Sequence, residues 1–130
     1  MKLLTLNLIL TALLVVSTLS SRTIAVEGIL KPTEGVLMTT TNYSELDSCH
    51  YRVKEGCLTA SGTIASETTI ACPRSWKFGT KVLIEGKEYV CEDHYQKNLS
   101  DRIDIFQGYG IEAHKKSLEF GIKNLTIVIK

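Results

Sequence analysis

Two aspartates in the second half of this 130-residue chain, Asp93 and Asp104, are the residues best suited to acid–base chemistry. Each lies at or near the end of a short segment typical of a β-strand, and eleven residues separate them. Enzymes that cleave glycosidic bonds commonly use two carboxyl groups, one for the leaving oxygen and one for the water or the anomeric carbon. Each aspartate also fits a structural role: Asp93 as a strand-end acid before a polar loop, Asp104 as a solvated or salt-bridged strand residue.

The segment before Asp93 predicts how the chain presents this residue. Residues 81–84 and 87–92 are rich in strand-forming side chains, and a Glu-Gly pair at 85–86 joins them. This pattern predicts a β-hairpin whose second strand delivers Asp93 to its exit. His94 follows directly, where it fits either a proton carrier or a histidine of a surface loop.

The segment around Asp104 reads RIDIF and alternates with the period of a strand. Ile103 and Ile105 therefore share one face, whereas Asp104 shares the other with Arg102 and Phe106. A carboxyl group that is buried there needs a hydrogen-bond partner or a wet cleft, because losing its water is costly.

The other expected elements frame these two segments. We expect a first strand from near Val36, a buried strand over 68–71 closed by Pro73, and a last strand over 124–129. One helix is expected over 112–120, with apolar contacts from Ala113, Leu118 and Phe120 and a stop at Gly121. The pattern is mostly β with one helix and fits any small closed barrel or sandwich.

Most of the chain resembles a known family of domains. The segments that carry the resemblance are TNYS at 41–44, CLTASG at 57–62, IACPRSWKFGTKVLI at 70–84, VCED at 90–93, DRIDIFQG at 101–108 and EAHKKSLEFGIKNLTIVI at 112–129. In this order they are similar to the three-aspartate domains of the membrane-bound lytic transglycosylase A family and of small stationary-phase-survival muralytic proteins. Wall-loosening expansins share the barrel of these domains. The resemblance implies a mostly β fold over residues 36–130, a six-stranded double-psi β-barrel with one short helix.

The resemblance also implies roles for individual residues. Asp104 matches the catalytic acid, and Asp93 matches a second cleft aspartate that supports it. The family segments that line the same cleft carry the residues expected to bind substrate, which are Tyr43, Thr59, Ser61, Arg102 and Gln107.

The chain departs from the family at two places. Cys72 stands where the family has the first of its three aspartates, and HYQKN at 94–98 replaces a Thr-Gly pair and a glycine-rich loop. The resemblance implies a peptidoglycan lytic transglycosylase, in which the C6 hydroxyl of N-acetylmuramic acid attacks its own anomeric carbon to form a 1,6-anhydro ring. Because one aspartate is missing, a non-catalytic, expansin-like module that binds polysaccharide or loosens the wall is the alternative.

The N-terminal region and the overall charge bear on location and partners. Residues 1–20 have Lys2, an apolar core and small or polar residues at the end, which predicts a secretory signal or an uncleaved anchor before a spacer over 21–35. Without Lys2 the 15 basic residues fall to 14, equal to the 14 acidic residues, so nucleic-acid binding is not predicted. We expect a secreted or cell-envelope monomer that acts on peptidoglycan or a related polysaccharide and needs no cofactor.

Four cysteines lie in the part of the chain expected to be exported, which favours two disulfides. Three pairings are possible from the sequence. Their intervals of 8, 15 and 19 residues contain no CxxC, so no metal site is predicted. The resemblance brings position 72 near the strand that ends at Asp93, which favours Cys72 with Cys91 and leaves Cys49 with Cys57.

Overall fold

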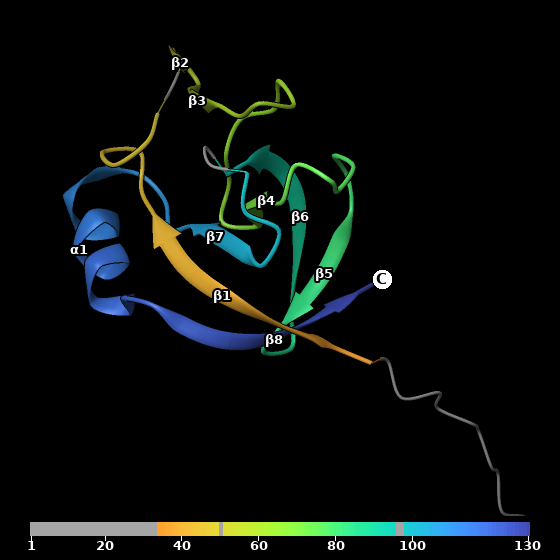
Figure 1. Ribbon diagram of the computed structural model, residues 1–130. Coiled ribbons are helices and arrows are strands. Elements are labelled where there is room, and N and C mark those ends of the chain that lie inside the picture. Colours follow the sequence, from red (N-terminus) through yellow and green to blue (C-terminus); the bar gives the residue numbers. More distant parts are fainter. Residues whose placement is uncertain (1–33, 50, 96–97) are drawn as a thin grey trace, which may run out of the picture. The chain divides into compact units, whose positions relative to one another are not determined.

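The structure is a computed structural model that describes residues 34–49, 51–95 and 98–130 (Figure 1). It contains eight strands and one helix: β1 (Val36–Tyr43), β2 (Tyr51–Val53), β3 (Gly56–Leu58), β4 (Thr69–Cys72), β5 (Lys81–Ile84), β6 (Lys87–His94), β7 (Arg102–Phe106), α1 (Gly110–Phe120) and β8 (Lys123–Ile129). The signal or anchor predicted over 1–20 and most of the spacer predicted over 21–35 lie outside the described residues.

Six of these strands close into a barrel in the order β1-β7-β4-β6-β5-β8. The β1–β7 and β4–β6 pairs are parallel, and the other pairs of the barrel are antiparallel. Strands β2 and β3 form a separate two-stranded sheet. The predicted fold class is confirmed in its mostly β character, its closed six-stranded barrel and its single short helix.

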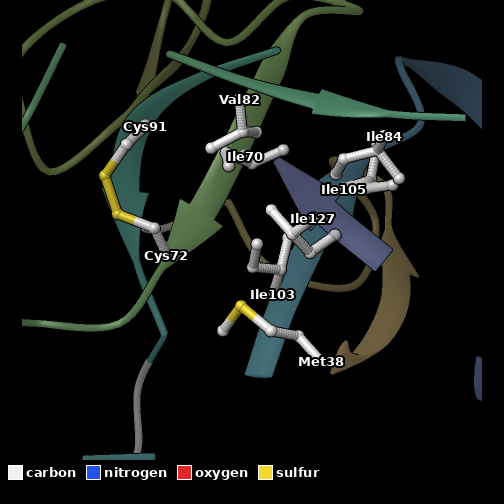
Figure 2. Close-up of a cluster of buried hydrophobic side chains, with 9 residues drawn as sticks. All are labelled: Met38, Ile70, Cys72, Val82, Ile84, Cys91, Ile103, Ile105 and Ile127. Atoms are coloured by element: carbon white, nitrogen blue, oxygen red, sulfur yellow. A yellow bond between two sulfur atoms is a disulfide. The ribbon is translucent and has the colours of Figure 1, made fainter. Parts of the chain in front are cut away.

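The barrel interior is filled by aliphatic and sulfur-containing side chains from all six strands (Figure 2). They are Met38, Ile70, Cys72, Val82, Ile84, Cys91, Ile103, Ile105 and Ile127. The predicted shared face of Ile103 and Ile105 is therefore confirmed. Side chains that point the other way from β4 and β7, Ala71 and Phe106, join a second buried cluster with Tyr43, Cys57 and Ala65.

Both predicted disulfides are present. Cys72 on β4 is bonded to Cys91 on β6 inside the barrel, and Cys49 is bonded to Cys57 on β3. The first bond joins two paired strands, and the second ties the segment after β1 to the β2–β3 hairpin. Two disulfides favour an oxidising environment outside the cytoplasm.

The predicted β5–β6 hairpin is confirmed, with one correction. Glu85 and Gly86 have φ values of 50° and 80°, and a two-residue turn with two positive φ values matches the twist of the strands it joins. Strand β6 continues to His94, two residues past the predicted end at residue 92, so Asp93 lies within the strand and not at its exit.

Helix α1 lies against β1 and begins at Gly110, two residues before its predicted start (Figure 1). Its buried side chains are Ala113 and Ser117, which are four residues apart and small enough for close packing. The predicted contact of Leu118 is wrong, because this side chain is on another face of the helix and is 67% exposed. Gly121 ends the helix with a φ of 65°, as predicted. In the described part of the chain, no helix is long and apolar enough to cross a membrane.

Candidate functional site

The strand register aligns the two predicted catalytic aspartates in one row across the barrel. Thr41 on β1 is paired with Asp104 on β7, Asp104 with Ala71 on β4, and Ala71 with Asp93 on β6. Neighbouring strands are about 4.8 Å apart, so the two aspartate backbones are roughly 10 Å apart. Because Ala71 between them has only a methyl group, both carboxyl groups border an open space.

A β-bulge in β6 brings Asp93 into this row. Cys91 is paired with Ile70, but the next residue of β4, Ala71, is paired with Asp93, so Glu92 is an extra residue in β6. Without the bulge, strict alternation would place Asp93 on the same face as Cys91, inside the barrel. The bulge turns Asp93 to the face of Ala71 and Asp104.

A pocket of about 500 Å³ lies over this row. Its wall includes Thr41, Tyr43, Asp47, Asp93, Arg102 and Asp104. The structure thus brings together four of the residues predicted from the sequence. Thr59, Ser61 and Gln107, which were predicted to bind substrate, are not part of this wall.

The carboxyl group of Asp104 has a strongly raised pKa. Burial raises the pKa of Asp104 from its ordinary value of 3.8 to about 6. Thr41 Oγ1 donates a hydrogen bond of 2.9 Å to Asp104 Oδ1, and this bond and the charge of Arg102 act against the increase. The negative charges of Asp47 and Asp93 add to the increase. With a pKa near 6, about one molecule in ten carries the proton at pH 7.

Asp93 is held by hydrogen bonds from the backbone. The amides of Ala60 and His94 donate to Oδ1 at 3.1 and 2.9 Å, and the hydroxyl of Tyr43 lies 3.5 Å from Oδ2. Burial and then the nearby charge of Asp93 raise the pKa of Tyr43 above its usual range, so the hydroxyl keeps its proton. The carboxylate of Asp93 therefore links β6 to the loop that contains Ala60.

That loop carries two of the predicted substrate contacts. The hydroxyls of Thr59, Ser61 and Thr63 lie 2.9 to 3.1 Å from one another and form a closed triangle. Thr59 lines a second pocket of about 390 Å³, beside the β2–β3 hairpin. Gln107 instead accepts a hydrogen bond of 2.6 Å from the Asn42 amide at the end of β1. These residues adjoin the main pocket through Ala60 and Asn42 rather than lining it themselves.

Asp47 is a third carboxylate of the pocket, and sequence reasoning missed it. Its Oδ2 accepts bonds from the backbone and hydroxyl of Ser44 at 2.8 and 2.7 Å and from the Ser117 hydroxyl at 3.2 Å. Its Oδ1 lies 2.9 Å from His114 Nδ1 on α1. Burial raises the pKa of Asp47, but these bonds, led by those from Ser44, outweigh burial and hold the pKa below its usual range. The Ser-x-x-Asp spacing at 44–47 signals such a local bond, but nothing in the sequence signals the contact with α1.

Three buried side-chain atoms have no hydrogen-bond partner within the described residues, and all three belong to residues that line the pocket. They are Asn42 Oδ1, His94 Nε2 and Arg102 Nε. Arg102 is oriented by Tyr95, whose hydroxyl lies 3.4 Å from Nη1, and the His94 ring stacks on Phe78. His94 is thus a half-buried strand residue and not a histidine of a surface loop. Most residues that line the pocket have polar side chains, so this wall is suited to a polar ligand.

One group of side chains in the described part of the chain has the spacing of metal ligands. Cys72, Cys91 and His94 offer donor atoms within 4.8 Å of one another. However, the two sulfurs are bonded to each other, and a disulfide lacks the thiolate that binds a metal ion. In this oxidised form His94 is the one ligand that remains in the group.

Comparison of the chain with protein-family models, with curated proteins and with solved structures finds no match. The resemblance to three-aspartate domains therefore stays a prediction from the sequence, and the geometry of the pocket is the independent observation.

Proposed function

We propose that the protein cleaves the glycan strand of peptidoglycan as a lytic transglycosylase, with Asp104 as the catalytic acid. The observation that carries this proposal is the buried carboxyl group of Asp104, whose pKa of about 6 suits proton transfer near neutral pH. It faces a pocket with two further carboxylates, Asp47 and Asp93. An acid with a raised pKa beside a second carboxyl group is the arrangement that glycosidic cleavage requires.

The reaction needs one group that changes its protonation state twice. Asp104 gives its proton to the glycosidic oxygen, and the bond between this oxygen and the anomeric carbon breaks with its electron pair on the oxygen. The C6 hydroxyl of the same N-acetylmuramic acid then bonds to the anomeric carbon and returns its proton to the Asp104 carboxylate. No water is consumed, so one acid is enough. The choice of this reaction over hydrolysis rests on the sequence resemblance.

The polar wall of the pocket supports a carbohydrate as the ligand. The lining includes the hydroxyl-bearing Thr41, the amide-bearing Asn42 and the cationic Arg102. Hydroxyl and acetamido groups of amino sugars can exchange hydrogen bonds with such side chains, whereas an apolar ligand would leave them without partners. We propose that substrate binding is part of the role of Arg102. The two disulfides and the predicted signal support a place outside the cytoplasm, where we propose that the protein acts as a monomer.

A non-catalytic module that binds polysaccharide or loosens the wall is the second candidate. It is favoured by Cys72, which stands where the family has an aspartate and is bonded to Cys91 inside the barrel. A carboxylate at this position is therefore absent, and a protein that only binds glycans would tolerate its loss.

The proposal is tested by mass spectrometry of purified peptidoglycan after incubation with the protein. We expect muropeptides with a 1,6-anhydro ring, which are lighter by one water than products of hydrolysis. Asp104→Asn is expected to release none, whereas Asp101→Asn, the same change at an exposed neighbouring position, is expected to act like the parent. An active Asp104→Asn variant would contradict the assignment, and a parent that binds peptidoglycan without releasing products would favour the second candidate.

A further inference from the structure

The three carboxylates of the pocket have different surroundings, which separates their roles. Asp104 receives one side-chain hydrogen bond, from Thr41, and is largely buried. Asp47 receives three hydrogen bonds from Ser44 and Ser117 and lies against His114. Groups whose surroundings favour opposite protonation states can serve as acid and anion in one reaction. Asp47 and Asp104 form such a pair.

Asp93 differs from Asp47 in the segments that it ties together. Two of its three hydrogen bonds come from backbone amides, those of Ala60 and His94, so its carboxylate holds the loop before β4 against β6. Among the charged groups that act on Asp104, Asp47 has the largest effect on its pKa, ahead of Arg102 and Asp93.

We propose that Asp47, held by Ser44, Ser117 and His114 at the wall of the pocket, is the carboxylate whose negative charge works with Asp104. This inference rests on the proposed function. As the glycosidic bond breaks, positive charge develops on the anomeric carbon and the ring oxygen of the sugar. The negative charge of Asp47, fixed in place by its hydrogen bonds, stabilises this charge without having to reorganise. Helix α1 has a part in the site, because His114 and Ser117 hold Asp47 from this helix.

The groups around Asp104 determine what removal of the Asp47 charge does. Thr41 faces it from β1, Arg102 from β7 and Asp93 from β6, while Asp47 approaches from the segment after β1. Without the charge of Asp47, the ionised form of Asp104 becomes easier to reach. The titration of Asp104 should therefore move to lower pH, because the charge of Asp47 adds to the increase in its pKa.

The test combines an NMR titration of the side-chain carboxyl carbons, without substrate, with the pH dependence of glycan cleavage. For Asp47→Asn we expect the Asp104 titration to move to lower pH and kcat to fall at least about tenfold. For Asp93→Asn we expect smaller changes in both. Ser117→Ala removes one anchor of Asp47 but keeps its charge, so the Asp104 titration should stay at the parent position. An unchanged titration and kcat in Asp47→Asn would overturn the inference.

The parent protein provides a measurement that does not depend on the folding of a variant. Its Asp47 carboxyl carbon should titrate at lower pH than that of Asp104, and the Asp104 signal should show a second small step where Asp47 titrates. A higher titration for Asp47, or no second step, would overturn the inference. If the parent does not cleave peptidoglycan, the proposed function is overturned. The titrations of Asp47 and Asp104 then still show by themselves whether the two carboxyl groups interact as inferred.

Discussion

Replacing the carboxyl group of Asp104 by an amide is expected to make the protein more stable at neutral pH. Burial raises the pKa of Asp104 from 3.8 to about 6 in the folded protein. Well below pH 3.8 the carboxyl group is protonated in both the folded and the unfolded chain, so it does not lower the unfolding free energy. As the pH rises from 3.8 to about 6, the unfolded chain loses this proton while the folded chain keeps it, so stability is lost over this range and the loss is complete above pH 6.

The size of this loss follows from the two pKa values. At about 1.4 kcal/mol per tenfold change in the ionisation constant, the step from 3.8 to about 6 corresponds to roughly 3 kcal/mol at pH 7.5. At pH 4.0 the same calculation gives only about 0.5 kcal/mol. The amide of Asp104→Asn still accepts a bond from Thr41, but its NH₂ group needs a new partner, which offsets part of the gain. We expect a net increase in the unfolding free energy of about 1–3 kcal/mol at pH 7.5 and little at pH 4.0.

Urea unfolding at the two pH values measures this difference. Trp76 is the single tryptophan of the chain and packs against the barrel core, so its fluorescence reports the transition. Asp101→Asn changes an exposed carboxylate nearby and should show no such dependence on pH. The argument that burial raises the pKa of Asp104 would be refuted by either of two results. One is an increase in the unfolding free energy of Asp104→Asn that is equal at both pH values, and the other is a decrease that grows with pH.

Two further expectations concern the neighbours of the pocket. Thr41→Val removes the hydrogen bond to the ionised form of Asp104, so its NMR titration should rise above 6 by about one pH unit, and an unchanged midpoint would contradict a role for this bond. Replacing Cys72 and Cys91 together by alanine opens a loop with a separation of 19 residues and should lower the unfolding free energy by about 3 kcal/mol, measured by denaturant unfolding. Equal stability of the parent and this double variant would show that the disulfide contributes little.

Much of the barrel could be predicted because its strands carry local signals. The alternation of RIDIF, the Glu-Gly turn at 85–86 and the β-branched residues of β8 each favour one structure within a few neighbouring residues. Helix α1 was harder, since its buried face is made of Ala113 and Ser117. The usual expectation that large apolar residues form the buried face of a helix favours Leu118 instead. Because α1 packs closely against β1, however, the contact requires small side chains.

The three carboxylates of the pocket reach it by three different means, and only one of these can be predicted from sequence. Asp104 depends on strand alternation, a local property, and its face was predicted correctly. Asp93 depends on a bulge, which arises from the pairing of β6 with β4 and leaves no mark in the residues of β6 alone. Asp47 depends on a contact with His114, 67 residues further along the chain. A tertiary contact of this kind adds a carboxylate to the pocket that no local pattern in the sequence announces, because the residues that hold it lie on α1, far along the chain.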